Sequence, residues 1–184
     1  MEQEFQIGDK AVVPNQGVGV ITDVKVLNIG GVQSLTYVVK MLDNGSAFHF
    51  PVGTAGKNNV RSIMAATVVP QVHEVLSDRD KPADKQTWNR RYREYTKKIT
   101  TNDPIEVAAV LRDLAVLRLG KALSFGERKM YDRAYQLLVQ ELAAVQDVDE
   151  EVVKGEIESL LKAADEAAQQ RGQAQPVGKK KKKA

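Results

Sequence analysis

Residues 8–52 read GDKAVVPNQGVGVITDVKVLNIGGVQSLTYVVKMLDNGSAFHFPV, and this stretch decides the fold of the N-terminal part of the chain. Turn-forming residues separate three β-rich runs, at residues 18–28, 32–42 and 46–52. Asn44-Gly45 predicts a type I′ hairpin, because both central residues of that turn need positive φ. Gly30-Gly31 predicts a second hairpin. Several short strands joined by close turns favour an SH3- or Tudor-like β-barrel over a sandwich.

From about Ala66 onward, the spacing of apolar residues becomes helical. Trp88, Tyr92, Tyr95 and Ile99 follow one another at helical intervals, which predicts one helix with these four side chains on a single apolar stripe. Asn102-Asp103-Pro104 is a typical helix start, and Ser124-Phe125-Gly126-Glu127 matches a capping box. We therefore expect helices at residues 70–76, from 88 to about 99, from 104 to about 120, from 125 to about 145 and from 149 to 168, with a polar linker at 77–84.

These patterns predict an α+β protein. Its expected domains are a Tudor/SH3-like small β-barrel at residues 1–65, a compact all-α helical domain at 66–168 and a disordered basic tail at 169–184. A tail of this composition, ending in a run of lysines, has too few apolar residues to form a packed core.

Composition narrows the class of protein. The chain has 184 residues, of which 42% are hydrophobic and 28% charged, as in an ordinary soluble protein. No apolar run is long enough to cross a bilayer. The acidic start, MEQEFQ, lacks a secretory signal, and the absence of cysteine is compatible with a reducing compartment, so we expect a cytoplasmic location.

Charge is distributed unevenly along the chain. Residues 1–65 are neutral overall, residues 66–144 carry a net charge of +3, and residues 145–178 carry −5 before the lysine run at 179–183. Residues 81–98 contain seven basic side chains and only two acidic ones. This local excess of positive charge, next to the only tryptophan, favours a polyanionic partner.

Two short motifs resemble a phosphate-binding loop and a zinc site, but neither has the residues that such a site requires. In Gly53-Thr54-Ala55-Gly56-Lys57 the glycines are too close together for a phosphate-binding loop, and Asn58 replaces the required hydroxyl residue. His73-Glu74 is not a zinc-binding motif, because Ser77 occupies the place of the second histidine. We therefore expect no enzymatic activity, no cofactor, no metal and no small-molecule substrate.

Residues 87–95, TWNRRYREY, are the best candidate for a binding site. Arginines provide affinity for phosphates, and flat aromatic rings can stack on bases or wedge between them. The alternative is a helix that buries its aromatic residues and leaves its arginines in solvent. Trp88 belongs to the first helical turn, where a large ring can project beyond the packed helices.

Five motifs occur here in the order seen in CarD/CdnL-type bacterial transcription regulators, which the chain resembles over residues 5–165. They are MEQEFQIGDKAVVPNQGVG, YVVKMLDNG, TWNRRYREY, EVAAVLRDL and LSFGERKM. The resemblance implies a Tudor-like domain that binds the RNA polymerase β subunit. It also implies a helical domain that contacts promoter DNA at the upstream edge of the transcription bubble, largely independently of sequence.

The resemblance also suggests roles for individual residues. Trp88 matches the tryptophan that the family wedges into the minor groove. Positions that match DNA-facing residues are Arg90, Arg91, Phe125 and Arg128. Positions on the strands used against polymerase are Val39, His49 and Pro51, although relatives often carry a hydrophobic residue in place of His49.

Three functional hypotheses remain open from the sequence. The first is a DNA wedge tethered to polymerase, which stabilises the open promoter complex. The second is a protein-interaction adaptor that binds no DNA and uses the barrel and the acidic last helix. The third is a relative of the transcription-repair coupling factor that retains only the polymerase-docking module. None of the three requires a membrane.

Overall fold

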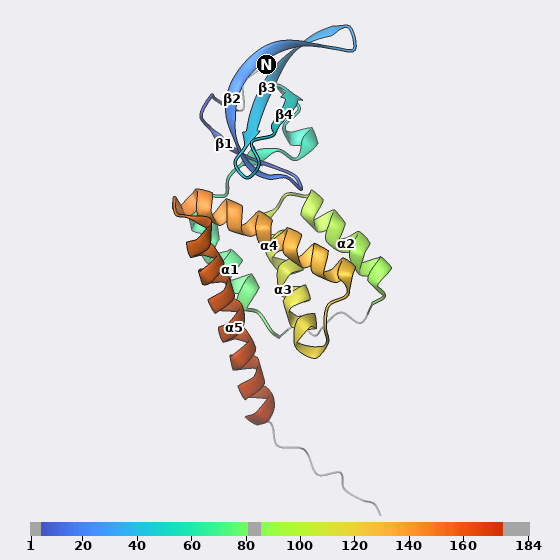
Figure 1. The fold of residues 1–184 in the computed structure, drawn as a ribbon, viewed down its shortest axis with the longest axis vertical. Coiled ribbons are helices and arrows are strands. Elements are labelled where there is room, and N and C mark those ends of the chain that lie inside the picture. Colours follow the sequence, from blue (N-terminus) through green and yellow to red (C-terminus); the bar gives the residue numbers. More distant parts are fainter. Residues whose placement is uncertain (1–4, 81–85, 175–184) are drawn as a thin grey trace, which may run out of the picture.

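A computed structural model describes residues 5–80 and 86–174, which form a curled β-sheet followed by helices (Figure 1). The strands are β1 (Lys10–Val13), β2 (Gly17–Ile29), β3 (Val32–Met41), β4 (Ala47–Pro51) and β5 (Arg61–Ser62). The α-helices are α1 (Val69–Ser77), α2 (Trp88–Thr100), α3 (Pro104–Gly120), α4 (Phe125–Gln146) and α5 (Glu150–Ala174). Two short 3-10 helices lie between β4 and α1, at Gly56–Asn58 and Ala66–Val68.

The sheet has the order β4-β3-β2-β1-β5, and all its neighbouring strands are antiparallel. A register shift between Ile21 and Asp23 interrupts the pairing of β2 with β3, and such bulges bend and twist a strand. The bent sheet encloses an apolar core that includes Tyr37 and Phe50. Phe5 meets Tyr37 edge to face, with ring centroids 5.6 Å apart. The predicted α+β class with a small N-terminal β-barrel is confirmed.

The two glycine turns differ from each other. Gly30 and Gly31 have φ of 62° and 85° and join β2 directly to β3, so the hairpin predicted there is confirmed. The type I′ turn predicted at Asn44-Gly45 is wrong, because only Gly45 has positive φ. The Asn44 side chain instead accepts a hydrogen bond from the Ser46 amide at 2.8 Å. This side-chain bond stabilises a longer loop than the two-residue turn.

Local capping signals set the starts of the two long inner helices. Asp103 caps α3 by accepting a hydrogen bond from the Ile105 amide at 2.9 Å. Ser124 and Glu127 form the complete predicted capping box at the start of α4. Helix α3 contacts the other four α-helices and buries residues on most of its circumference, as expected for a central helix.

Some elements differ from the sequence-based expectations. Strands β1 and β5 were not predicted; β1 pairs with β2, and β5 pairs with β1. Helix α5 continues to Ala174, so residues 169–174 of the expected disordered tail are helical, and the lysine run at 179–183 lies outside the described residues. Within the described parts of the chain, no helix combines the length and apolar character needed to span a membrane.

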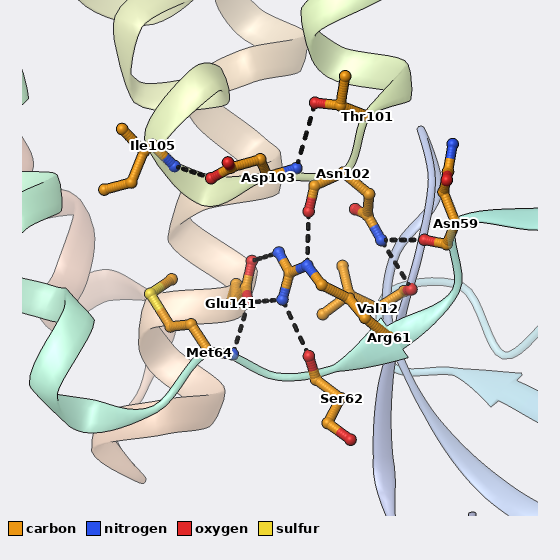
Figure 2. A network of polar contacts seen from close by, with 10 residues as sticks. All are labelled: Val12, Asn59, Arg61, Ser62, Met64, Thr101, Asn102, Asp103, Ile105 and Glu141. Atoms are coloured by element: carbon orange, nitrogen blue, oxygen red, sulfur yellow. Dashed lines mark hydrogen bonds and ion pairs between the residues drawn. The ribbon is translucent and has the colours of Figure 1, made fainter. Parts of the chain in front are cut away.

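A network of polar contacts joins the barrel to the helices (Figure 2). The Arg61 guanidinium, on β5, donates to both carboxylate oxygens of Glu141 on α4, at 2.5 and 2.8 Å. Arg61 Nε donates to the Asn102 carbonyl oxygen, and Asn102 Nδ2 donates to the carbonyl oxygens of Val12 and Asn59 at 2.9 and 2.8 Å. The two bodies are therefore joined by bonds of fixed direction.

Replacing Arg61 tests how much these contacts between the barrel and the helices contribute to stability. Glu141 is 3% exposed, and in Arg61→Met its carboxylate would keep only the Met64 amide among these donors, at 2.8 Å. We expect the free energy of unfolding to fall by about 3 kcal/mol, because a buried charge loses its partner. Urea denaturation followed by circular dichroism measures the change.

Lys25→Met provides the matched control, because Lys25 pairs with Asp23 at 3.2 Å with both side chains about half exposed. Its loss should change the free energy of unfolding by less than about 1 kcal/mol. Equal effects of the two substitutions would show that the Arg61–Glu141 pair contributes no more than a surface ion pair.

Candidate nucleic-acid interface

The first turns of α2 and α4 lie against each other, and their contact defines the candidate site. The Trp88 indole is partly buried at the edge of the helical core and packs against the Gly126 backbone. A Cβ atom built on Gly126 would lie 2.9 Å from Trp88 Cζ2, so only glycine allows this approach. Trp88 also meets Tyr92 edge to face, with ring centroids 5.5 Å apart.

Aromatic side chains beside this contact are open to solvent. Phe125 is 85% exposed and Tyr92 is 49% exposed. Exposed apolar side chains that gather in one patch indicate a contact surface, whereas single exposed ones do not. Trp88, Tyr92 and Phe125 are thus brought together from two helices that begin 37 residues apart in sequence, at Trp88 and Phe125.

The predicted apolar stripe of α2 is rotated in the structure. The buried residues of α2 are Arg91, Tyr95 and Ile99, while Tyr92 faces solvent. Arg91 takes the place on the buried face that the sequence pattern assigned to an aromatic residue. A buried arginine is possible here because the buried carboxylate of Glu127, on α4, lies next to the Arg91 guanidinium.

Arg91 therefore does not fit the predicted role of a phosphate-binding residue. It is only 4% exposed, and its Nη2 donates to Glu127 Oε1 at 2.5 Å. Burial by itself lowers the pKa of Arg91, whereas hydrogen bonds to Glu127 and Tyr95 raise it, and the net shift is upward. The guanidinium is charged, but its charge is compensated inside the protein.

Glu127 is ionised in this environment. Burial by itself raises the pKa of the Glu127 carboxyl, but the hydrogen bond from Arg91 and those from Ser124 and Lys121 lower the pKa to about 2. A carboxylate with several donors keeps its charge because each donor favours the ionised form. The Arg91–Glu127 pair is thus a permanent ion pair at neutral pH.

The remaining predicted basic residues are accessible. The Arg90 side chain is 70% exposed, and among the described residues it pairs with Glu94 at a long distance of 3.7 Å. Arg128, in the first turn of α4, is also exposed. The guanidinium groups of Arg90 and Arg128 are therefore available to an anionic partner.

A groove of about 590 Å³ follows α2 and α4 from the site towards the barrel. Ile99 and Met130 line it together with the basic side chains of Lys129 and Arg133. Asn15 and Gln16, from the turn between β1 and β2, also line it. The sequence does not predict Lys129, Arg133 or Gly126 as site residues, because their place in the groove and against Trp88 follows from how α4 packs beside α2 and the β1–β2 turn.

The barrel residues predicted to face polymerase are in different environments. Val39 is fully buried in the barrel core, so its side chain is not available to a partner. His49 is exposed and Pro51 is partly exposed, both on β4. In the described part of the sheet, β4 is a terminal strand paired only with β3, and a terminal strand can add a further strand from a partner.

Comparison with known proteins finds similarity for both the barrel and the helices. Residues 5–64 match the family model described as CarD-like/TRCF RID domain, and residues 71–158 match the model described as CarD, C-terminal domain. The proposed transcription factor YdeB of Bacillus subtilis (strain 168) is 30% identical over 154 residues, which span 82% of this chain and 97% of YdeB.

Among solved structures, the 72-residue N-terminal domain of Myxococcus xanthus CarD, determined by solution NMR, is similar to part of the chain. It is 24% identical, covers 34% of this chain and 83% of that domain, and gives a TM-score of 0.29.

The contact between Trp88 and Gly126 can be tested by Gly126→Ala. The added methyl group would overlap the indole at 2.9 Å, so we expect the ring to move outward while α4 remains folded. Trp88 is the only tryptophan, so its fluorescence reports this directly: the emission should shift to the red and acrylamide quenching should increase.

Gly155→Ala in α5 is the matched control, since nothing lies within 4 Å of the position that its methyl group would occupy. It should raise the free energy of unfolding by about 0.5–1 kcal/mol and leave the fluorescence unchanged. Unchanged fluorescence in Gly126→Ala as well would contradict the described packing of Trp88.

Proposed function

The chain belongs to the CarD family of transcription regulators, and we propose that it prolongs the open promoter complex by holding Trp88 at the upstream edge of the bubble. The N-terminal match is to an RNA polymerase-interacting domain, so the chain regulates transcription through contact with polymerase. The observation that carries the finer proposal is the partly exposed Trp88 flanked by exposed Phe125, Arg90 and Arg128.

Docking on the polymerase β subunit would use the barrel. A partner strand could pair with the terminal strand β4, where main-chain hydrogen bonds give affinity and side chains such as His49 and Pro51 give specificity. Docking raises the effective concentration of the helices near promoter DNA, so weak DNA contacts are sufficient. This fits the small net charge of +3.

Trp88 would then act where the duplex meets the melted strands. Inserting a ring into intact DNA costs a few kcal/mol of unstacking, but at the bubble edge part of that stacking is already lost. Stacking of a base on an aromatic ring contributes about 1–3 kcal/mol. Because this contribution is larger in the open state, it shifts the equilibrium towards that state.

The basic residues would position the ring without recognising a sequence. Arg90 and Arg128 would contact phosphates, whereas Arg91 has no part in these contacts because Glu127 occupies its guanidinium. Phe125 would extend the apolar surface presented to the minor groove. No step makes or breaks a covalent bond, so the proposed function is not enzymatic.

Replacing Trp88 tests the proposed wedge. In Trp88→Ala we expect open complexes to collapse about tenfold faster, equivalent to about 1.4 kcal/mol of lost stacking, with unchanged polymerase binding. Trp88→Phe retains a ring and should give an intermediate lifetime. Filter binding after a heparin challenge measures the decay.

The same experiment separates the wedge from the adaptor alternative. If the protein is an adaptor, open complexes formed with Trp88→Ala should decay at the wild-type rate. The effect of the protein on open-complex lifetime should then depend little on salt. A wedge with phosphate contacts predicts a contribution that falls steeply as salt increases. Unfolding of the helices in Trp88→Ala, seen by circular dichroism, would also count against the wedge.

A charge on β4 tests the proposed docking surface. Pro51→Glu should weaken binding to the isolated β subunit at least tenfold, because a desolvated carboxylate would lie at the interface. Its Trp88 fluorescence should not change. Ser159→Glu, at an exposed position on α5, adds the same charge away from the barrel and should bind normally in the same pull-down assay. Normal binding by both variants would exclude this surface.

A further inference from the structure

Arg91 connects three parts of the candidate site. Its Nε donates to the Gln86 carbonyl oxygen at 3.2 Å, and its Nη2 donates to Glu127 on α4. Its guanidinium carbon lies 5.6 Å from the centroid of the Trp88 ring, within the range of a cation–π contact. Arg91 thus holds the backbone before Trp88, the neighbouring helix and the indole itself.

The Glu127 carboxylate, which binds Arg91, is itself held in place by hydrogen bonds. Its carboxylate accepts hydrogen bonds from the Ser124 amide at 2.9 Å and from Lys121 Nζ at 3.2 Å, in addition to Arg91. The Glu127 amide in turn donates to Ser124 Oγ. Glu127 is 1% exposed and belongs to the capping box of α4, so its position follows from the start of that helix.

Arginine suits this position better than lysine would. A guanidinium is planar and can donate in its plane to Gln86 and Glu127 while its face lies over an aromatic ring. A lysine could keep the charge and one hydrogen bond, but not the second bond and the stacked contact together. Trp88 is then confined by Arg91, Tyr92 and Gly126.

We propose that Arg91 is a positioning residue that, supported by Glu127, holds the Trp88 indole in the orientation in which it meets DNA. The consequence for promoters rests on the proposed function, whereas the restraint on the ring is a property of the free protein. A ring that is ordered before binding loses less conformational entropy when it inserts, so affinity for the open state increases.

Fluorescence of the full-length protein tests the restraint without DNA. In Arg91→Lys and Arg91→Met, the acrylamide quenching constant of Trp88 should rise about twofold, because the guanidinium no longer covers one face of the ring. The fluorescence anisotropy should gain a fast component from motion of the indole. Glu127→Gln should produce a smaller change in the same direction.

Arg112→Lys is the matched control for loss of a buried ion pair. Arg112 on α3 is 4% exposed, like Arg91, and pairs with Asp113 at 2.5 Å and Asp78 at 3.5 Å. It should lower stability without changing quenching or anisotropy. Wild-type quenching and anisotropy in both Arg91 variants, or equal changes in Arg112→Lys, would overturn the proposal. All spectra are recorded under conditions in which circular dichroism shows that each variant is folded.

Open-complex lifetimes then connect the restraint to function. If Arg91 acts through Trp88, Arg91→Lys should shorten the lifetime, and the double variant Arg91→Lys/Trp88→Ala should match Trp88→Ala alone. Additive effects would instead make Arg91 an independent DNA contact and overturn the positioning role. A wild-type lifetime in Trp88→Ala would reject the proposed wedge. The fluorescence of the free protein would still test the restraint on Trp88 independently of that result.

Discussion

The bidentate ion pair between Arg61 on β5 and Glu141 on α4 lies at the contact between the barrel and the helices and helps to set their relative placement. It lies within a network in which Asn102 binds carbonyl oxygens of the barrel and its own carbonyl accepts from Arg61. Asn102 has a φ of 61°, a conformation that asparagine tolerates better than other residues with a side chain. A joint made of directional bonds resists rotation more than an apolar contact of similar size.

Helix α4 is the element that relates the two proposed binding surfaces. Glu127 in its first turn binds Arg91 beside Trp88, and Glu141 near its other end binds Arg61 beside the barrel. These two glutamates are 14 residues apart, or about 21 Å along an α-helix. A rigid helix with an ion pair near each end would fix the position of Trp88 relative to a barrel bound to polymerase. This geometry suits the proposed bridge between polymerase and DNA, in which high affinity for DNA alone is not needed.

Much of the architecture could be predicted because it depends on local interactions. The capping box at Ser124, the Asp103-Pro104 helix start and the Gly30-Gly31 hairpin each involve neighbouring residues, and all three are present. The sequence patterns do not predict β1 and β5, because both strands are short. β1 pairs with its neighbour β2, whereas β5 depends on pairing with β1, which is distant in sequence. The type I′ turn predicted at Asn44-Gly45 is wrong, because Asn44 lacks the positive φ that this turn requires and its side chain accepts a hydrogen bond from the Ser46 amide.

The amino-acid sequence by itself determined the fold class, the order of the helices and the window around Trp88, because turn chemistry, capping and periodicity act between residues close in the chain. Only the tertiary structure decided which side chains of that window face solvent. Periodicity predicts that Tyr92 lies on the apolar stripe with Trp88, Tyr95 and Ile99, yet Arg91 is buried and Tyr92 is half exposed. The reason is electrostatic: an arginine is stable in the interior only beside a carboxylate, and Glu127 reaches it from 36 residues away through the packing of α4 against α2.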